Sequence, residues 1–265
     1  GIDGNNQVKA KGIHGSIEWQ ASDTVMLKSV TAYREDDTES VIDFDALEVD
    51  DLDAAVIYAN SQFSQEFQLQ YSSDKLNGIV GFYYLDASAS NDFDVVLGQL
   101  GRVAFGQELV AYTGGSVDTK AWSVFADMTY DVSDQFAVSL GGRYTHDKRT
   151  ADVFRASYLG ASSPFFGNDA AIFLSSTSDF ENSRTYKDFS PRIALDYALS
   201  DDAKVYASFS RGFKAGSFDP RGANFSSPEV AEGFEPETLD SYELGFKSTL
   251  MEGRMRANMA VFFQD

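Results

Sequence analysis

The chain has 265 residues, no cysteine and a formal net charge of −20, with 41 acidic and 21 basic residues. The absence of cysteine excludes disulfides and thiolate metal sites, and the acidic balance argues against a nucleic-acid partner, which would need a basic patch. Tyrosine and phenylalanine are abundant, at 13 and 22, and proline is scarce, at 5, which favours an all-β fold.

No apolar stretch approaches the 18 residues that a membrane-spanning helix needs. A β-barrel can cross a membrane without such a run, because its inward side chains stay polar. The polar, glycine-rich residues 1–12 are expected to form a loop, and they lack the apolar core of a signal peptide.

The first four strands are predicted at 13–20, about 24–35, 62–71 and near 77–88. Between the second and the third, residues 36–58 hold nine acidic residues and no basic one. This segment is expected to be a long loop that the flanking strands partly enter.

The clearest pattern follows at 117–149, where apolar and polar residues alternate on both sides of a short polar turn. This predicts a β-hairpin with one apolar and one polar face. Its apolar face begins and ends in aromatic residues at Trp122 and Tyr130, then at Phe136 and Tyr144. Eight residues at about 3.3 Å each, tilted by about 40°, rise about 20 Å, close to the apolar band of an outer-membrane barrel.

Further strands are predicted at 185–199, 203–214 and 237–250, with a last strand after the turn Glu252-Gly253. Ten strands joined by five short turns and four long loops are typical of a transmembrane antiparallel up-and-down β-barrel. A soluble β-sandwich also alternates, but its strands are shorter and its loop lengths do not segregate by side. The long extracellular loops are expected near 36–58, 89–115, 150–184 and 215–236.

Catalysis is not expected. His14 and His146 are the only histidines, and no GxSxG motif accompanies them. No cofactor is predicted.

The acidic loop at 36–58 has oxygen ligands for Ca²⁺ and charge that attracts a cation. We favour the simpler interpretation, a solvated loop that divalent ions bridge to lipopolysaccharide.

Exposed aromatic side chains on loops usually contact something. Four in the loop at 150–184 are therefore candidates for ligand capture: Phe154, Tyr158, Phe165 and Phe166. The alternative is that they pack among the loops themselves.

Arg211 shares the outward phase of its strand, where a charge costs about 2–4 kcal/mol at mid-membrane and about 0–1 near the interface. It is expected at the outer rim, paired with lipid phosphate.

Charged side chains on the polar faces of the predicted strands are expected to face the lumen. There they would contact a plug, line a ligand route or form a ladder of cross-strand charge pairs. They are Glu66, Asp127, Arg143, Asp196, Lys204, Glu243 and Lys247.

Several stretches resemble the barrel domain of TonB-dependent outer-membrane receptors: LKSVTAYRE (27–35), FSQEFQLQY (63–71), YKDFSPRIALDYALSDDAKVYASFSRGFKAGSF (186–218) and FEPETLDSYELGFKSTL (234–250). The resemblance implies a barrel of about 22 strands closed by an N-terminal plug. It also implies location in the outer membrane of a Gram-negative bacterium and import of a ligand such as a ferric siderophore, driven by the TonB complex.

The resemblance is incomplete, because neither a plug domain nor a TonB box is recognised in the sequence. Residues 1–265 are therefore expected to be part of the barrel domain of a longer receptor. The expected partners are outer-membrane lipid and lipopolysaccharide, a small ligand, and the TonB complex through the missing N-terminal region. The alternatives are a passive diffusion porin with an inward constriction loop, an outer-membrane barrel enzyme, and a soluble adhesin-like β protein.

Overall fold

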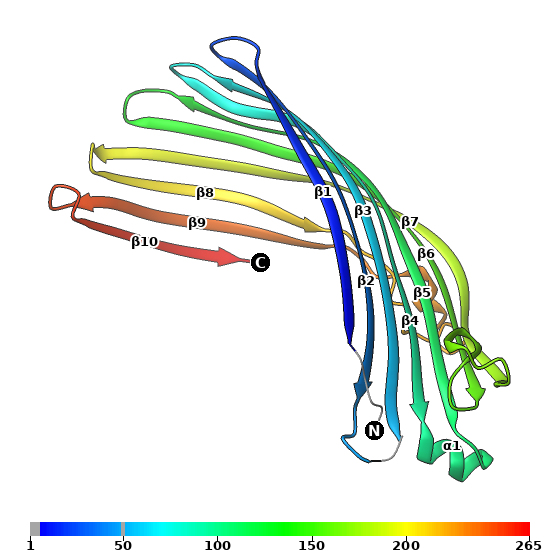
Figure 1. Cartoon of the computed structure of the whole chain (residues 1–265). Helices are drawn as coiled ribbons and strands as arrows, with labels where there is room; N and C mark the ends of the chain where they lie inside the picture. The colour runs from blue at the N-terminus through cyan, green and yellow to red at the C-terminus, as the bar shows by residue number, and fades with distance from the viewer. Residues whose placement is uncertain (1–5, 49–50) are drawn as a thin grey trace.

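Ten antiparallel strands, each paired with the next in the chain, form one curved open sheet in the computed structural model (Figure 1). The structure describes residues 6–48 and 51–265. The strands are β1 (Gln7–Gln20), β2 (Val25–Asp43), β3 (Leu52–Ser72), β4 (Leu76–Leu97), β5 (Leu109–Asp131), β6 (Phe136–Leu159), β7 (Ile172–Ser200), β8 (Ala203–Lys214), β9 (Glu237–Leu250) and β10 (Met255–Gln264).

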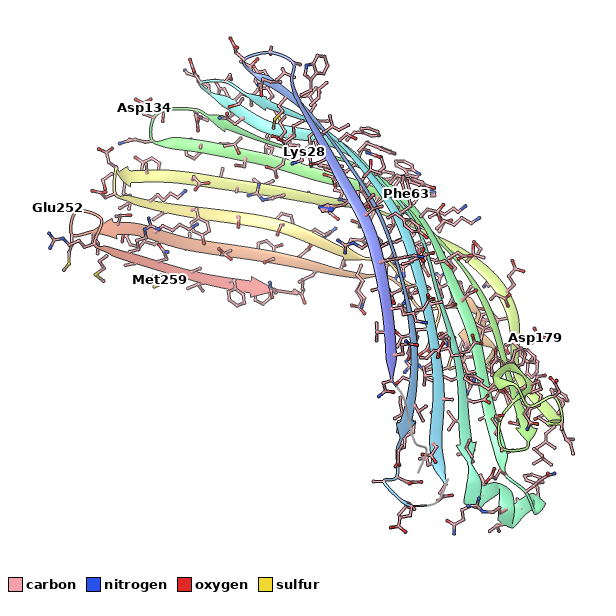
Figure 2. The ribbon with its side chains drawn as sticks, in the orientation of Figure 1. Lys28, Phe63, Asp134, Asp179, Glu252 and Met259 are labelled. Atoms are coloured by element: carbon pink, nitrogen blue, oxygen red, sulfur yellow. The ribbon has the colours of Figure 1, made fainter. Side chains whose placement is uncertain are left out.

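The short turns gather at one end of the sheet and the longer connections at the other (Figure 1). In Figure 2, Asp134 and Glu252 lie in turns at the first end, and Asp179 lies near the second. The longer connections contain helix α1 (Gly98–Phe105) and two 3₁₀ helices, η1 (Pro164–Phe166) and η2 (Pro228–Glu232). Across residues 6–48 and 51–265, no helix is both long and apolar enough to cross a membrane. The prediction of ten strands with this asymmetry is confirmed.

Three of the four predicted loops are much shorter than expected, because the strands continue into them. β2 runs to Asp43 and β3 starts at Leu52, so little of the segment 36–58 is loop, and positions 49–50 lie outside the described residues. Most of 89–115 belongs to β4, α1 and β5, and most of 150–184 belongs to β6 and β7. Only 215–236, between β8 and β9, is the long loop that was predicted.

The N-terminal segment shows the same error, since β1 begins at Gln7, inside the predicted loop 1–12, of which residues 1–5 lie outside the described part. The physical reason is the same in each case. Hydrophobic alternation reports that one strand face is apolar. Beyond the apolar band the two faces no longer divide into one apolar and one polar face, so the alternation weakens while the backbone hydrogen bonds to the neighbouring strand continue.

The strand register keeps like side chains together in rows across the sheet. Phe82 pairs with Val124, which pairs with Tyr144, and one position away Phe125 pairs with Arg143. We call the positions in step with Val124 the apolar face and those in step with Arg143 the polar face. On the apolar face Leu140 is 57% exposed and Phe189 is 59% exposed, so no second layer covers this band. Such a surface needs an apolar medium beside it.

Strand β7 is the longest, with 29 residues, but it pairs with β8 only from Arg192 to Ser200. Its remaining edge toward β8 meets the loop at 215–236 instead. The Phe225 N–H donates to the Thr177 carbonyl at 3.2 Å, and the Asp179 N–H donates to Asn224 Oδ1 at 3.2 Å. The loop thereby covers strand-edge groups that would otherwise be open to another chain.

Candidate functional site

The seven charged residues predicted to face the lumen all lie on the polar face of the sheet. Three of them, Asp127, Asp196 and Lys204, take part in two ion pairs across strands. Arg192 Nη1 lies 2.9 Å from Asp127 Oδ2, and Lys204 Nζ lies 3.1 Å from Asp196 Oδ1. Sequence reasoning missed Arg192 as a partner, although its place in the alternation of β7 was a usable signal.

Tyr206 of β8 extends this ladder to β9. Its hydroxyl donates a hydrogen bond to Glu243, and Lys247 Nζ lies 5.0 Å from the centre of its ring. The structure thus brings Asp196, Lys204, Glu243 and Lys247 together around one tyrosine that the sequence analysis had not singled out.

Arg143 and Glu66 lie apart from this group. The Arg143 guanidinium is 5.5 Å from the ring centre of Tyr83 and 5.7 Å from that of Phe125. Glu66 accepts a hydrogen bond from Gln68 of its own strand. The polar face near the turns therefore holds two ion pairs and several contacts between cationic side chains and aromatic rings.

The polar face near the long connections is covered by residues 215–236, which we call the inner loop. Phe218 is 4% exposed and packs against Ala151 and Val153, both 0% exposed. Arg155 donates to the Arg221 carbonyl and, at 2.9 Å, to Thr113 Oγ1. The inner loop is therefore docked on strands β5, β6 and β7.

A glycine allows this close approach. At Gly115, which lies on the polar face of β5, an added Cβ would come within 2.6 Å of Pro220 Cβ. Only a residue without a side chain lets the loop reach the strand here.

The aromatic residues predicted to capture ligand lie on the other side of the sheet. Phe154 and Tyr158 belong to β6 and not to a loop, while Phe165 and Phe166 form η1. Tyr112 and Phe165 stack with ring centres 4.0 Å apart, and Phe154 lies 6.1 Å from Phe165. We call Tyr112, Phe154 and Phe165 the aromatic cluster. Its geometry matches the alternative given above, packing among the connections, and a role in ligand capture stays a prediction.

One carboxyl group holds the connection at 160–171 over this cluster, and a second binds the cluster itself. Asp94 Oδ2 accepts the Ser163 N–H at 2.5 Å, and Asp92 Oδ1 accepts the Tyr112 hydroxyl at 2.5 Å. Burial raises the pKa of Asp94, against the lowering effect of its bond to Ser163. Burial and the bond to Asp92 also raise the pKa of Tyr112, so its hydroxyl remains a donor.

Arg211 lies near the end of β8 on the apolar side, opposite Asp240 of β9. Its Nε and Nη2 donate to the two Asp240 carboxylate oxygens at 2.6 and 2.7 Å. This bidentate partner was not foreseen. The pairing of Arg211 with lipid phosphate stays a prediction, and it would have to share the guanidinium with Asp240.

The two histidines lie far apart, His14 on β1 and His146 on β6, where His146 stacks on Trp122 with ring centres 5.4 Å apart. Within residues 6–48 and 51–265, no group of three or more histidine, aspartate or glutamate side chains is arranged to hold a metal ion. These residues include most of the acidic segment at 36–58.

A single-layer, up-and-down antiparallel sheet with one apolar face and one polar face is the wall of a transmembrane β-barrel. The family model described as "TonB dependent receptor-like, beta-barrel" matches residues 3–265. The chain therefore belongs to the TonB-dependent receptor β-barrel family, whose members lie in the outer membrane of Gram-negative bacteria.

Individual relatives are distant. The ferric-pyoverdine BN7/BN8 receptor of Pseudomonas putida is 24% identical over 147 residues, which are 56% of this chain and 15% of that receptor. The ferric yersiniabactin uptake receptor FyuA of Yersinia pestis has a TM-score of 0.73 at 16% identity, covering 98% of this chain and 35% of FyuA. The copper transporter OprC has a TM-score of 0.69 at 11% identity, covering 97% of this chain and 38% of OprC. The match thus spans about a seventh of the curated relative, and the chain spans a little over a third of the solved structures.

Proposed function

We propose that the chain is part of the barrel wall of a TonB-dependent outer-membrane receptor that imports a ferric siderophore or a similar scarce nutrient. The observation that carries the proposal is the family match from residue 3 to 265, on a sheet that separates an apolar from a polar face. The apolar face would contact outer-membrane lipid, and its rim would contact lipopolysaccharide. The polar face would line the lumen.

In this proposal the rest of the protein supplies the further strands, a plug domain and the contact with the TonB complex. Strands β1 and β10 are the two edges of the sheet described here. A strand edge inside a bilayer must be paired, because each unsatisfied backbone group there costs several kcal/mol. The proposal therefore places a neighbouring strand of the same barrel against each edge.

The nature of the cargo is the open part of the proposal. A ferric siderophore is supported by the ligands for which FyuA and the pyoverdine receptor are named. OprC, named as a copper transporter, has a comparable TM-score, so the fold alone does not select iron.

The test is uptake by the intact receptor. The complete gene would be deleted and restored in its own host, and uptake of ⁵⁵Fe-loaded citrate, pyoverdine and ferrichrome would be measured in iron-limited cells. We expect uptake of at least one chelate to need both the receptor and TonB. Uptake that needs the receptor but persists without TonB would support the alternative of a passive porin. The docked inner loop would then correspond to the inward constriction loop of that porin. If the deletion changed the uptake of no chelate, the iron-import proposal would be wrong.

A further inference from the structure

The arginines of β6 and β7 share one face of the sheet. The two lysines of these strands, Lys148 and Lys187, are on the apolar side of the alternation, whereas every arginine is on the polar side. In a chain with a formal charge of −20, this is a local concentration of positive charge. A guanidinium presents a planar fork of donors that fits a carboxylate, which a lysine ammonium does not. The arginines are Arg143, Arg149, Arg155, Arg184 and Arg192.

Two of them, Arg149 and Arg184, are directly opposite each other in the register of β6 and β7. The Cβ atoms of such partners lie about 4.5–5.5 Å apart, and like charges in this position repel. The arrangement therefore requires negative charge nearby. Asp147 supplies part of it, because its carboxylate accepts hydrogen bonds from Arg149 Nε at 3.2 Å and Nη2 at 3.4 Å.

The inner loop supplies the rest, at Arg184. Arg184 Nη2 donates to Glu235 Oε1 at 2.7 Å, and its Nη1 donates to the carbonyls of Glu232 and Gly233 at 3.1 and 3.5 Å. All three acceptors lie between residues 232 and 235, so this short segment fills the coordination of the guanidinium. The Arg184 guanidinium also lies 5.2 Å from the ring centre of Tyr186.

Tyr186 lies close to both ion pairs, because it is opposite Asp147 in the register of β6 and β7 and its ring contacts Arg184. Its side chain is buried, 5% exposed, and its hydroxyl donates to the Phe234 carbonyl at 3.2 Å. Burial raises the pKa of this phenol, and the charges of both Arg184 and Arg149 oppose the rise.

We infer that Arg149 and Arg184 form a binding site for a ligand that carries carboxylate groups, and that Glu235 of the inner loop occupies this site in the present structure. The inference rests on the proposed function, in which the polar face lines the route of an imported chelate. It adds the chemical class of that chelate, an anionic one with at least two carboxylates.

A dicarboxylate ligand can displace Glu235 from Arg184. The Glu235 side chain is 77% exposed, and ion pairs at exposed positions contribute little. A ligand with two linked carboxylates engages both guanidinium groups, and the second contact then forms within one complex at a high effective concentration. Until the ligand arrives, Glu235 of the inner loop neutralises Arg184 and Asp147 of β6 neutralises Arg149.

The test uses citrate, a metal-free tricarboxylate, and the purified full-length receptor. Citrate affinity is measured by calorimetry, and hydrogen exchange of the Gly233 and Phe234 amides reports whether the segment of the inner loop that binds Arg184 loosens. Both amides donate within the loop, to Val230 and Ser217. We expect citrate to accelerate exchange of these amides by displacing Glu235.

The variants have opposite expected signs. Arg149→Gln and Arg184→Gln should each weaken citrate binding about tenfold or more, because a charge-assisted hydrogen bond is lost. Glu235→Gln should strengthen it about two- to fivefold, because it removes the competing charge of an exposed pair. Arg211→Gln is the matched control, an arginine paired with a carboxylate on the opposite face, and should leave affinity unchanged.

Equal citrate affinity in the wild type, Arg184→Gln and Glu235→Gln would overturn the inference, and so would the absence of citrate binding. A variant that only misfolds could not reproduce the expected gain in Glu235→Gln. Iron uptake decides the proposed function separately. A receptor that imports ferrichrome, an uncharged chelate, but does not bind citrate keeps the proposed function and loses this inference.

Discussion

The two ends of strands β5, β6 and β7 are built differently. Toward the short turns the sheet is a single layer, with Val124 47% exposed on the apolar face. Toward the long connections the same strands are covered on both sides, by the inner loop on the polar face and by η1 on the other. A sheet inside a bilayer has lipid to cover its apolar side chains, whereas strands that extend into water must bury theirs against protein. The difference shows where the membrane ends along each strand.

The largest expected effect comes from uncovering the polar face. Phe218→Ala should destabilise the docked state of the inner loop by about 3–5 kcal/mol, since a buried phenyl ring is replaced by a cavity. Hydrogen exchange of the inner-loop amides in the full-length receptor measures this change. Phe225→Ala is the control, because this ring of the same loop is 60% exposed. Equal effects of the two variants would contradict the assignment of Phe218 as the anchor.

The single-layer end is tested by a charge placed on either face at the same depth. Phe67→Arg should lower the free energy of unfolding in lipid vesicles by about 2–4 kcal/mol, as an arginine facing lipid near the midplane does. Gln68→Arg puts the same side chain on the polar face beside Glu66, and its effect should be much smaller. Urea titration of the full-length receptor measures both. A larger loss for Gln68→Arg would mean that the two faces have been assigned in reverse.

The covered end should also respond to pH through Asp94. Its pKa is raised above the ordinary 3.8 in the docked state, so the docked state binds the proton more tightly than the open state. Docking of residues 160–171 is therefore most stable below the ordinary carboxyl pKa and weakens as pH rises through the raised one. Asp94→Asn should remove this slope, as measured by exchange of the Ser163 amide after correction for its intrinsic rate. A slope that persists in Asp94→Asn would assign it to another group.

The smallest effect is expected at the rim between the two ends. Arg211→Leu breaks an exposed bidentate pair with Asp240 and should cost about 0.2–1 kcal/mol of stability. A larger loss of lipopolysaccharide binding than of stability, measured by co-purification and urea titration, would support the predicted contact with lipid phosphate. If neither quantity changed, Arg211 would have no role at the rim.

The errors of sequence reasoning fall at the end of the sheet that carries the long connections. The segment 150–184 was predicted to be a loop, yet Phe154 and Tyr158 both lie in β6. Their aromatic contacts come from β5, η1 and β7, which are distant from them in the sequence or follow a turn. The lumen-facing candidates at the single-layer end lie on one face as expected. The alternation is clear there because one face needs an apolar medium beside it and the other does not.

By itself, the sequence determined the number of strands, the positions of the short turns and the division into two faces. Each of these follows from residues a few positions apart, since successive side chains of a strand point to opposite sides. Only the tertiary structure decided that Arg192 meets Asp127, 65 residues away, that Arg149 and Arg184 are directly opposite, and that the inner loop folds onto the polar face. Those arrangements depend on strand register and on contacts between distant segments, for which a single chain pattern carries no local signal.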